Sequence, residues 1–402
     1  MTTPLHKKVR IYLDHAAATP LDADVFRALE PYLTHHFGNA SAIHEEGKNA
    51  RMAVEAARAQ VAKTLAIRPE EIIFSGSGTE SNNLAIMGHL RHLKETGRTY
   101  ETMEVLTTEI EHPSILALLP ELTTLGVTVK MVGVDSTGKI QSAELRTLLS
   151  SRTVLITFAY VNSEIGVIQP VHALVRIIRQ YERENGSRVF IHLDAAQAPL
   201  WLSCKLEALG VDALALDSGK FCGPKGVGIV AIRKPKELRS IVFGGGQEGG
   251  VRPGTENVAG VVGAALALEL AQERYEARAE ATTLVRDAAI LKLRAAFPGL
   301  LLNGPEGASR VANNINVSLP NLDTEYAVVF LDAEGIAAST KSACAGGGSG
   351  VSHVVLAATG DEVRAKATLR FTLGEHTTPS ELESVVSALQ LFTITMQALT
   401  KE

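Results

Sequence analysis

The sequence predicts an α/β protein in which a large domain with a mainly parallel sheet is joined to a smaller α+β domain. From about residue 70 to about 235, short apolar or β-branched runs alternate with segments of helical period. This alternation is typical of parallel strands connected by covering helices. After the glycine cluster at 244–250, a long Ala-, Leu- and Glu-rich helical segment precedes mixed strands and helices. A chain of 402 residues also exceeds the usual size of a single core.

Each expected strand of the large domain is a short apolar run next to a turn or helix signal. In chain order these strands are EIIFSG, MEVLTT, VTVKMVGV, RTVLITFAYV, RVFIHLDAA, DALALDS and GVGIVAIRK. The helices between them include ESNNLAIMGHLRHLKE, HPSILALLPELTTLG and VHALVRIIRQYEREN. The second domain is expected to begin with one helix from about Glu256 to Phe297.

The charge balance argues against nucleic acid as a partner. Lys and Arg number 39 against 44 Asp and Glu, so the net charge is -5 and no overall basic field would hold a phosphodiester backbone. The hydrophobic fraction of 46% and the charged fraction of 21% are those of a soluble globular protein.

The cysteines and the N-terminal sequence favour the cytoplasm. Cys204, Cys222 and Cys344 lie far apart without a CxxC pair, which argues against a disulfide framework and against a structural metal site. The opening residues MTTPLHKKVRIYLDHAAATP contain no apolar run long enough for a signal peptide or a membrane span. We therefore expect a protein of a reducing compartment that does not enter a membrane.

A candidate phosphate site lies at residues 74–83, FSGSGTESNN, where a strand, a glycine-rich turn and a helix start follow one another. Free backbone N–H groups and Thr79 at this turn would suit a phosphate. The alternative is an ordinary βα turn. The third glycine of GxGxxG is missing and GxxxxGK[ST] is absent, so a nucleotide-binding dehydrogenase is poorly supported.

Polar residues follow two further expected strands, RVFIHLDAA and DALALDS. Asp194 ends HLDAAQA at the edge where parallel sheets bind ligands, so it would pair with a protonated pyridine nitrogen or cap the next helix. Gln197 in the same segment would donate to an oxygen of such a ring. Lys220, in a Gly- and Pro-rich turn, would lose proton affinity near a cationic ring and form an imine. Its rival in the same turn is Lys225.

Each of four further residues has two interpretations, one as a catalytic or ligand-binding group and one as a structural residue. His112 would stack on a flat ring and move protons, or be structural, and Asn162 ends its strand or is a loop amide. Cys344 precedes the glycine run AGGGSG, so it is a candidate nucleophile or an unreactive thiol. Arg370 in TLRFTLG would bind a substrate carboxylate in a fork, or form a structural ion pair.

In their order and spacing these segments resemble one family, the cysteine desulfurases, within the class V aminotransferases of the fold type I pyridoxal 5′-phosphate (PLP) enzymes. The resemblance covers nearly all 402 residues. It rests on YLDHAAATP, FGNASAIHEEG, FSGSGTESNN, IEHPS, VNSEIGVIQP, HLDAAQA, GKFCGPKGVG, GGGQEGGVRPGTEN, SACAGG followed by SHVVLA, and LRFTLG.

The resemblance implies a fold type I PLP transferase with a large PLP-binding domain at 14–262. The small domain would comprise 1–13 and 263–402 and carry the catalytic cysteine loop. Lys220 would be the Schiff-base lysine, His112 the stacking acid-base group and Cys344 the sulfur acceptor. The implied cofactor-binding residues are Gly78, Thr79, His112, Asn162, Asp194, Gln197, Ser218, Lys220 and, at the phosphate of the other subunit in a homodimer, Thr255. Arg370 and Asn39 are the implied substrate-binding residues.

The implied activity is the PLP-dependent removal of sulfur from L-cysteine, which gives L-alanine and a persulfide on Cys344. The persulfide would pass to an acceptor protein for iron–sulfur clusters, thio-cofactors or tRNA. One alternative keeps the fold and changes the reaction, as in a selenocysteine lyase or another PLP-dependent lyase or aminotransferase. Another is a catalytically idle sulfur-carrier or scaffold protein.

The sequence departs from the family at the expected phosphate site. Asp217, Ser218 and Gly219 stand where a serine two places before a histidine is usual, just ahead of the lysine. Ser218 is a substitute ligand, whereas an inward-pointing Asp217 would repel the phosphate. Gly249 stands where arginine is common, and Lys341 where the cysteine loop usually has glycine. We therefore expect weaker retention of PLP on dialysis than is usual in the family.

Overall fold

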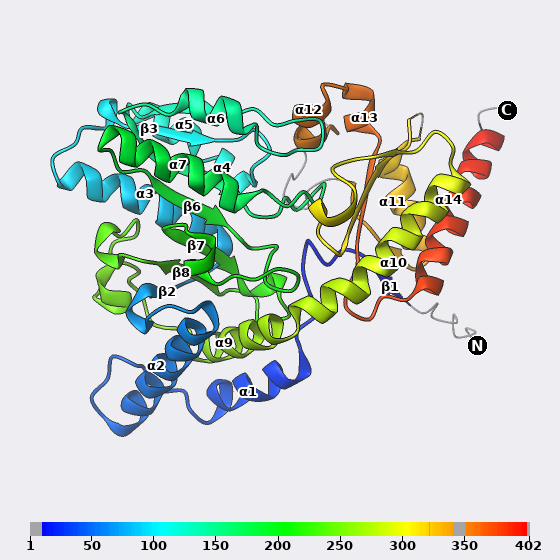
Figure 1. Cartoon of the computed structure of the whole chain (residues 1–402). Helices are drawn as coiled ribbons and strands as arrows, with labels where there is room; N and C mark the ends of the chain where they lie inside the picture. Colours follow the sequence, from blue (N-terminus) through cyan, green and yellow to red (C-terminus); the bar gives the residue numbers. More distant parts are fainter. Residues whose placement is uncertain (1–9, 321, 341–349, 400–402) are drawn as a thin grey trace.

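The computed structural model describes residues 10–320, 322–340 and 350–399, and Figure 1 shows how their helices and strands are arranged. A central sheet lies between layers of helices. The sheet is formed by β2 (Ile72–Ser75), β3 (Glu104–Thr107), β4 (Thr128–Met131), β5 (Thr153–Ala159), β6 (Phe190–Asp194), β7 (Ala213–Asp217) and β8 (Gly228–Ile232). All seven strands expected from the sequence are present, and the α/β fold class is confirmed.

The strand order of the sheet is β2-β8-β7-β6-β5-β3-β4, and every pairing except those of β8 is parallel. β8 runs antiparallel to both of its neighbours, β2 and β7. Parallel strands need a crossover of a dozen or more residues, and the segment between β7 and β8 is shorter than that. The sheet is therefore mainly parallel with one reversed strand.

Helices cover both faces of the sheet, and alternate strand residues face the two layers. Ile229 and Ala231 of β8 pack in one core cluster, whereas Val230 and Ile232 pack in another, as the two-residue period of a strand requires. The first cluster includes side chains of α1 (Ala23–Thr34), α2 (Glu45–Leu65), α6 (Ser142–Leu148), α7 (Val171–Asn185), α8 (Leu206–Leu209) and α9 (Val258–Glu273). The second includes side chains of α3 (Gly78–Glu95), α4 (Pro113–Leu116) and α5 (Leu119–Thr124).

The C-terminal part of the chain has its own small sheets and core (Figure 1). One sheet has the antiparallel order β12-β10-β9, and the other pairs β1 with β11 in parallel. These elements are β1 (Ile11–Tyr12), β9 (Leu301–Leu302), β10 (Asn314–Ser318), β11 (Ile336–Ala337), β12 (Thr368–Thr372), α10 (Tyr275–Ala296), α11 (Thr324–Ala333), α12 (His353–Thr359), α13 (Glu362–Lys366) and α14 (Pro379–Leu399). The N-terminal strand thus joins the C-terminal part, while the domain boundaries stay a prediction.

The single helix expected from about Glu256 to Phe297 is two helices, so that expectation is wrong. α9 ends and α10 begins around Arg274, whose φ of -117 and ψ of 4 leave the helical region. In Figure 1, α9 lies with α1 and α2 below the central sheet, and α10 runs on beside α14. The break allows each half to pack on a different core.

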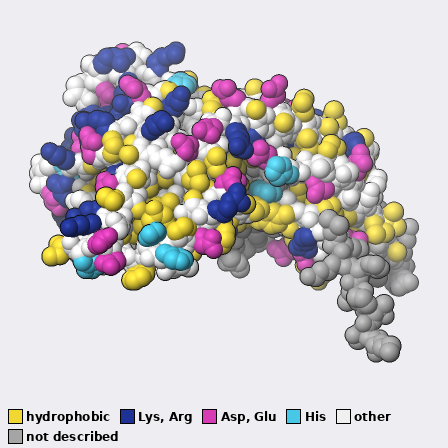
Figure 2. All heavy atoms as spheres, turned by 90° about the horizontal axis from the view of Figure 1, so that it is seen from below, with side chains coloured by type: hydrophobic (Ala, Val, Ile, Leu, Met, Phe, Trp, Pro, Cys, Tyr) yellow, Lys and Arg dark blue, Asp and Glu magenta, His cyan; other side chains and the backbone are white. Residues whose placement is uncertain are grey.

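The described residues contain no helix that is both long and apolar enough to span a bilayer. Basic and acidic side chains are interspersed over the face shown in Figure 2, so this face carries no field of a single sign. Such a mixed surface gives little general attraction for a polyanion.

Candidate active site

A cavity of about 130 Å³ lies beyond the carboxyl ends of β5, β6 and β7. Ligands of open α/β sheets collect at this edge. The segment at 16–17 and residues from α12 and β12 of the C-terminal part close it. Most of the site residues expected from the sequence line this cavity, namely Gly78, Thr79, His112, Asn162, Asp194, Gln197, Lys220 and Arg370.

Asp194 is the last residue of β6 and is 7% exposed. Its Oδ2 accepts a hydrogen bond from Asn82 Nδ2 at 2.8 Å, and its Oδ1 accepts one from the Ala196 N–H at 3.0 Å. Both donors are neutral, so the buried carboxylate is solvated without being neutralised. A cation placed against it would be strongly favoured.

Asn82 and Ser114 support Asp194, and neither was among the site residues expected from the sequence. Asn82 Nδ2 also donates to Ser114 Oγ at 2.9 Å, and Asn82 Oδ1 is buried without a hydrogen-bond partner. Asn82 lies four residues after Gly78 on α3, and residues with this spacing share one helix face. The helical period could therefore have pointed to Asn82 once Gly78 was assigned to the site.

Lys220 and its rival Lys225 have different surroundings. Lys220 lines the cavity, and its Nζ donates to the carbonyl oxygens of Ala16 and Ala17 at 3.1 and 2.6 Å. Lys225 is exposed, does not line the cavity and donates to the Thr19 carbonyl at 3.3 Å. The geometry favours Lys220 as the amine that acts within the cavity.

His112 both caps a helix and faces the cavity, so its two interpretations are compatible. Its Nδ1 accepts a hydrogen bond from the Ser114 N–H at 3.1 Å, which places the proton of the neutral ring on Nε2. Burial is the largest influence and lowers the pKa of His112. A largely neutral imidazole near pH 7 can stack on a flat ring.

Asn162 and Arg370 also combine structural contacts with a place in the cavity lining. Asn162 Nδ2 donates to the Ile110 carbonyl at 2.8 Å, so the side chain joins its own loop to the segment before His112. Arg370 is 1% exposed, and its Nη2 donates to Asp14 Oδ1 at 2.8 Å. Its Nε is buried and has no hydrogen-bond partner among the described residues. The expected structural ion pair exists, yet one charged N–H remains for a ligand.

At the other end of the cavity, the carboxylate of Asp217 lies at the start of α3. Its Oδ2 accepts a hydrogen bond from the Gly78 N–H at 3.1 Å. Ser218 Oγ is buried without a partner and faces Gly223, where an added Cβ would lie 2.1 Å from it. Asp217 lines the cavity and Ser218 does not. The structure thus does not bring Ser218 into the site as a substitute phosphate ligand.

Two other expected site residues are not in the cavity lining, and a third lies outside the described residues. Asn39 is exposed, and its side chain accepts a hydrogen bond from the Ser41 N–H at 2.9 Å. Thr255 is also exposed and lies elsewhere on the surface. Cys344, like Lys341, lies outside the described residues. The roles assigned to these residues stay predictions.

Glu111 is a buried acid of the cavity that sequence reasoning missed. It is 2% exposed, and burial raises its pKa to about 8, with the nearby charge of Asp194 acting in the same direction. The peptide carbonyl of Glu111 lies 3.3 Å from His353 Nε2, and His353 also lines the cavity. Glu111 immediately precedes His112, but nothing local distinguishes a buried glutamate from an exposed one.

The residues around the cavity fit the pyridine ring of PLP. In the part of the chain that the structure describes, the buried carboxylate of Asp194 has no cationic partner and Asn82 Oδ1 has no donor, while the amine of Lys220 opens on the same space. The N-terminal end of α3 suits a phosphate, although Asp217 already places one negative charge there. The residues at the ring end of the cavity suit the pyridine ring. At the phosphate end, the negative charge of Asp217 opposes the phosphate.

Comparisons with known proteins agree with this geometry. Residues 11–385 match the class V aminotransferase family. The cysteine desulfurase IscS of Dictyoglomus turgidum is 37% identical over 383 residues, which cover 95% of this chain and 94% of the relative. The cysteine desulfurase IscS of Methanosarcina thermophila is 35% identical over 379 residues, covering 94% and 91%.

Solved structures resemble the whole chain. A NifS-like protein superposes with a TM-score of 0.88 at 32% identity, covering 96% of this chain and all of the other. The protein SspA, solved in complex with cysteine, superposes with a TM-score of 0.77 at 29% identity over 92% of this chain. The resemblance expected from the motifs is confirmed. The chain belongs to the cysteine desulfurases, PLP-dependent enzymes with the fold of the class V aminotransferases.

Proposed function

We propose that this protein removes the sulfur atom of L-cysteine, releases L-alanine and carries the sulfur as a persulfide on Cys344. The observation that carries the proposal is that Asp194, Lys220 and Arg370 open on one cavity. A carboxylate for a ring cation, an amine and a guanidinium N–H thereby surround one small space. This set suits an amino acid bound next to PLP.

In this proposal PLP, when bound, supplies an aldehyde for the amino group and a ring that accepts electrons from Cα. Asp194 would keep the ring nitrogen protonated, and neutral His112 would lie against the ring. Gln197 would donate to the ring oxygen. Gly78 and Thr79 would hold the phosphate from the start of α3, where backbone N–H groups and the helix dipole favour an anion.

Arg370 and Lys220 would act on the substrate. The unpartnered Nε–H of Arg370 would bind the substrate carboxylate, while Asp14 and the Ser163 carbonyl hold the guanidinium in place. Asn39 is proposed to assist. Lys220, released from the Ala16 and Ala17 carbonyls, would take the Cα proton and return a proton to the product.

Cys344 would be the nucleophile that takes the sulfur. Its thiolate would attack the sulfur of cysteine, so that an S–S bond forms as the C–S bond breaks. L-cysteine and the Cys344 thiol thereby become L-alanine and a persulfide. An acceptor protein would then receive the sulfur, in the cytoplasm, for iron–sulfur clusters, thio-cofactors or tRNA.

We further propose a homodimer in which Thr255 reaches the phosphate site of the other subunit. Several large apolar side chains of the single chain are exposed, among them Phe243 at 89%, Ile43 at 86% and Phe37 at 76%. Exposed apolar side chains are a feature of interaction surfaces. Burial of these side chains against a second copy would remove them from water.

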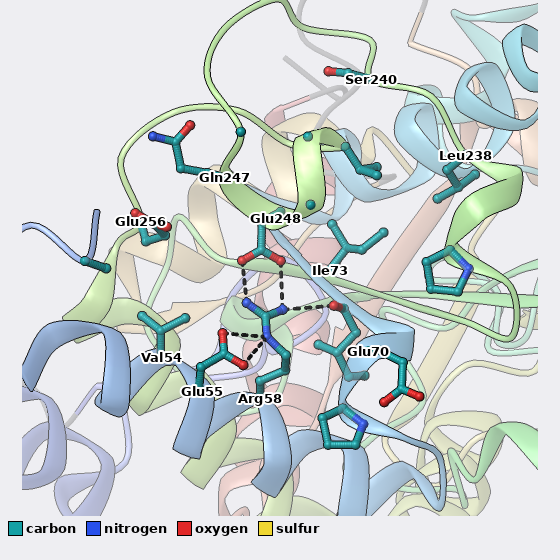
Figure 3. A pocket seen from close by; sticks show the side chains of 18 of the residues that line it. Val54, Glu55, Arg58, Glu70, Ile73, Leu238, Ser240, Gln247, Glu248 and Glu256 are labelled. Carbon is teal, nitrogen blue, oxygen red and sulfur yellow. Dashed lines mark hydrogen bonds and ion pairs between the residues drawn. The ribbon is translucent and has the colours of Figure 1, made fainter. Parts of the chain in front are cut away.

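Arg58 and Glu248 line a hollow of about 1210 Å³, and Figure 3 shows that their side chains point toward each other. Arg58 Nη2 and Nη1 lie 2.7 and 2.8 Å from the two carboxylate oxygens of Glu248. The paired hydrogen bonds fasten the 244–250 segment to α2. Gly249 follows with a φ of 64, in the left-handed region that suits glycine. The segment that leads to Thr255 is therefore anchored at Glu248.

Borohydride reduction of the yellow protein, followed by peptide mapping, tests the site assignment. The modified residue should be Lys220, and modification at Lys225 would refute the assignment. Supplied with L-cysteine and a thiol, the protein should release equal amounts of alanine and sulfide. Cys344→Ala should bind PLP and release no sulfide. A marked preference for selenocysteine, or absence of both PLP and turnover, would instead support one of the alternative functions.

A further inference from the structure

The side chain of Asp217 occupies backbone donors at the end of the cavity where the cofactor phosphate is proposed to lie. Asp217 Oδ2 accepts the Gly78 N–H at 3.1 Å, and Asp217 Oδ1 accepts the Gly219 N–H at 2.9 Å. Gly78 is the first residue of the 18-residue helix α3, whose N-terminal end carries partial positive charge. One anion of the protein itself therefore already uses this anion-binding position.

The local packing holds the carboxylate there. A Cβ added to Gly78 would lie 2.9 Å from Asp217 Cβ, so the two residues are in close contact. A Cβ added to Gly219 would lie 3.3 Å from both Asp217 Oδ1 and Lys225 Cγ. Any larger side chain at 219 would be crowded. Glycine at 219 and aspartate at 217 thus form one arrangement, in which the carboxylate lies against a residue that has no side chain.

The cations near Asp217 are engaged elsewhere. Lys220 donates to the Ala16 and Ala17 carbonyls, and Lys225 donates to the Thr19 carbonyl. On α3, Glu80 adds a second carboxylate, but its Oε1 pairs with Arg252 Nε at 2.8 Å. Other titratable groups that line the cavity are His112, whose pKa is lowered by burial, and Glu111, Glu164, Asp194 and His353. Among the described residues no ion pair involves Asp217.

We propose that Asp217 makes binding of a phosphate group at this end of the cavity depend on the uptake of a proton, and thereby sets the affinity for the cofactor. The inference rests on the proposed function, because that function brings a phosphate to the start of α3. Two anions at one helix terminus repel each other, so the complex is more stable when one of them is protonated. The proton goes to Asp217 or to the phosphate, whose second pKa is about 6 in its ordinary esters.

The direction of the pH effect follows from linkage. When the complex holds more protons than its separated parts, affinity rises as pH falls, by up to about tenfold per pH unit for one proton. Removal of the charge at 217 should abolish this dependence and strengthen phosphate binding. The affinity for a ligand without the phosphate should not depend on the charge at 217.

Titration calorimetry on the cofactor-free full-length chain tests the proposal with pyridoxine 5′-phosphate and pyridoxine. Neither probe has an aldehyde, so proton release from Lys220 on covalent attachment does not enter. The ratio of their two dissociation constants measures what the phosphate contributes. Repeating the titrations in buffers with different heats of ionisation counts the protons taken up.

The comparison covers wild type, Asp217→Asn, Asp217→Ser and Asp323→Asn. Asp323 caps α11 and does not line the cavity, so its variant controls for loss of a helix-capping carboxylate. In Asp217→Asn the phosphate contribution should rise by about tenfold or more, as one pKa unit of interaction corresponds to a factor of ten. Wild type and Asp323→Asn should take up more protons than either variant at 217. Asp217→Ser gives the same test should the asparagine variant fold poorly.

Equal phosphate contributions in wild type and both variants at 217, or equal proton uptake, would overturn the inference. A weaker phosphate contribution in the variants would also overturn it, since Asp217 would then assist the phosphate. In either case, borohydride labelling of Lys220 and turnover of cysteine would leave the proposed function standing. Absence of binding of both probes and of PLP to every variant would overturn the function and the inference together.

Discussion

The carboxylates that end the neighbouring strands β6 and β7 have contrasting surroundings. Asp194 is 7% exposed and receives its hydrogen bonds from Asn82 and the Ala196 N–H. Asp217 is partly exposed and receives its hydrogen bonds from the Gly78 and Gly219 N–H groups. Each acid lines the same cavity. Asp194 is held by one side-chain amide and one backbone N–H, and Asp217 by two backbone N–H groups, one of them at the start of α3.

The register of the sheet explains why the two acids serve different ends of the cavity. Asp194 pairs with Ala215, so Asp217 stands two residues farther along β7. Two residues advance a strand by about 7 Å. The same side chain at the same edge of the sheet thus faces the ring end in one case and the phosphate end in the other. The proposed ligand is positive at its ring nitrogen and negative at its phosphate. Asp194 should therefore favour its binding, and Asp217 should oppose it.

Replacement of Asp194 by asparagine should have the largest effect. The amide cannot keep the ring nitrogen protonated, so desulfurase turnover should fall on the order of 10³-fold, about 4 kcal/mol of barrier. Initial rates of alanine release measure this, alongside Asp135→Asn as a control in an exposed turn. The comparison depends on opposite effects: Asp194→Asn should lower turnover, whereas Asp217→Asn should strengthen phosphate binding. Turnover within tenfold of wild type in Asp194→Asn would break it.

Replacement of Arg370 by lysine tests whether the guanidinium belongs to the ring end as the substrate clamp. Lysine keeps a cation beside Asp14 but loses the planar fork, so KM for cysteine should rise on the order of 10²-fold with a smaller change in kcat. Arg364, which donates to Asn303 and lies outside the cavity lining, supplies the control variant Arg364→Lys. A fall in kcat with unchanged KM would contradict the clamp.

The strand framework and the main site residues could be predicted because their signals are local. Apolar runs that end in turns marked β6 and β7, and parallel strands bring their carboxyl ends to one edge. Asp194 and Lys220 were placed together by this rule and do line one cavity. The division of the long helix at Arg274 could not be found in this way, because no glycine or proline marks it.

Other parts of the site depend on contacts between distant segments. Asp217 meets Gly78 across 139 positions of sequence, and Asn82 meets Asp194 across 112. Sequence could say that an inward-pointing Asp217 would oppose a phosphate, but its direction is set by the packing of α3 on β7. The burial of Glu111 likewise arises from packing around the cavity. Local sequence patterns therefore predict which residue types lie at the site, whereas tertiary contacts determine the burial and the direction of their side chains.

Glu111 allows the electrostatics of the ring end to be tested through stability. Burial raises its pKa to about 8 from 4.5, so the folded state favours the protonated acid. This stabilisation is fully present below pH 4.5 and is lost as pH rises through 8. Between about pH 6 and about pH 9 it should fall on the order of 2 kcal/mol. Urea unfolding of wild type should show this loss, and Glu111→Gln should not; equal pH dependence in both would remove Glu111 as its source.

The smallest effect is expected at the phosphate end, in the absence of any ligand. Asp217→Ala should lower the free energy of unfolding of the cofactor-free protein by about 1 kcal/mol, because the Gly78 N–H at the start of α3 and the Gly219 N–H after β7 lose their acceptor. Asp217→Asn retains one oxygen acceptor and should lose less. Urea unfolding of the two variants gives the order. If Asp217→Ala is as stable as wild type, its carboxylate is not capping α3, and the contrast with Asp194 would rest on charge alone.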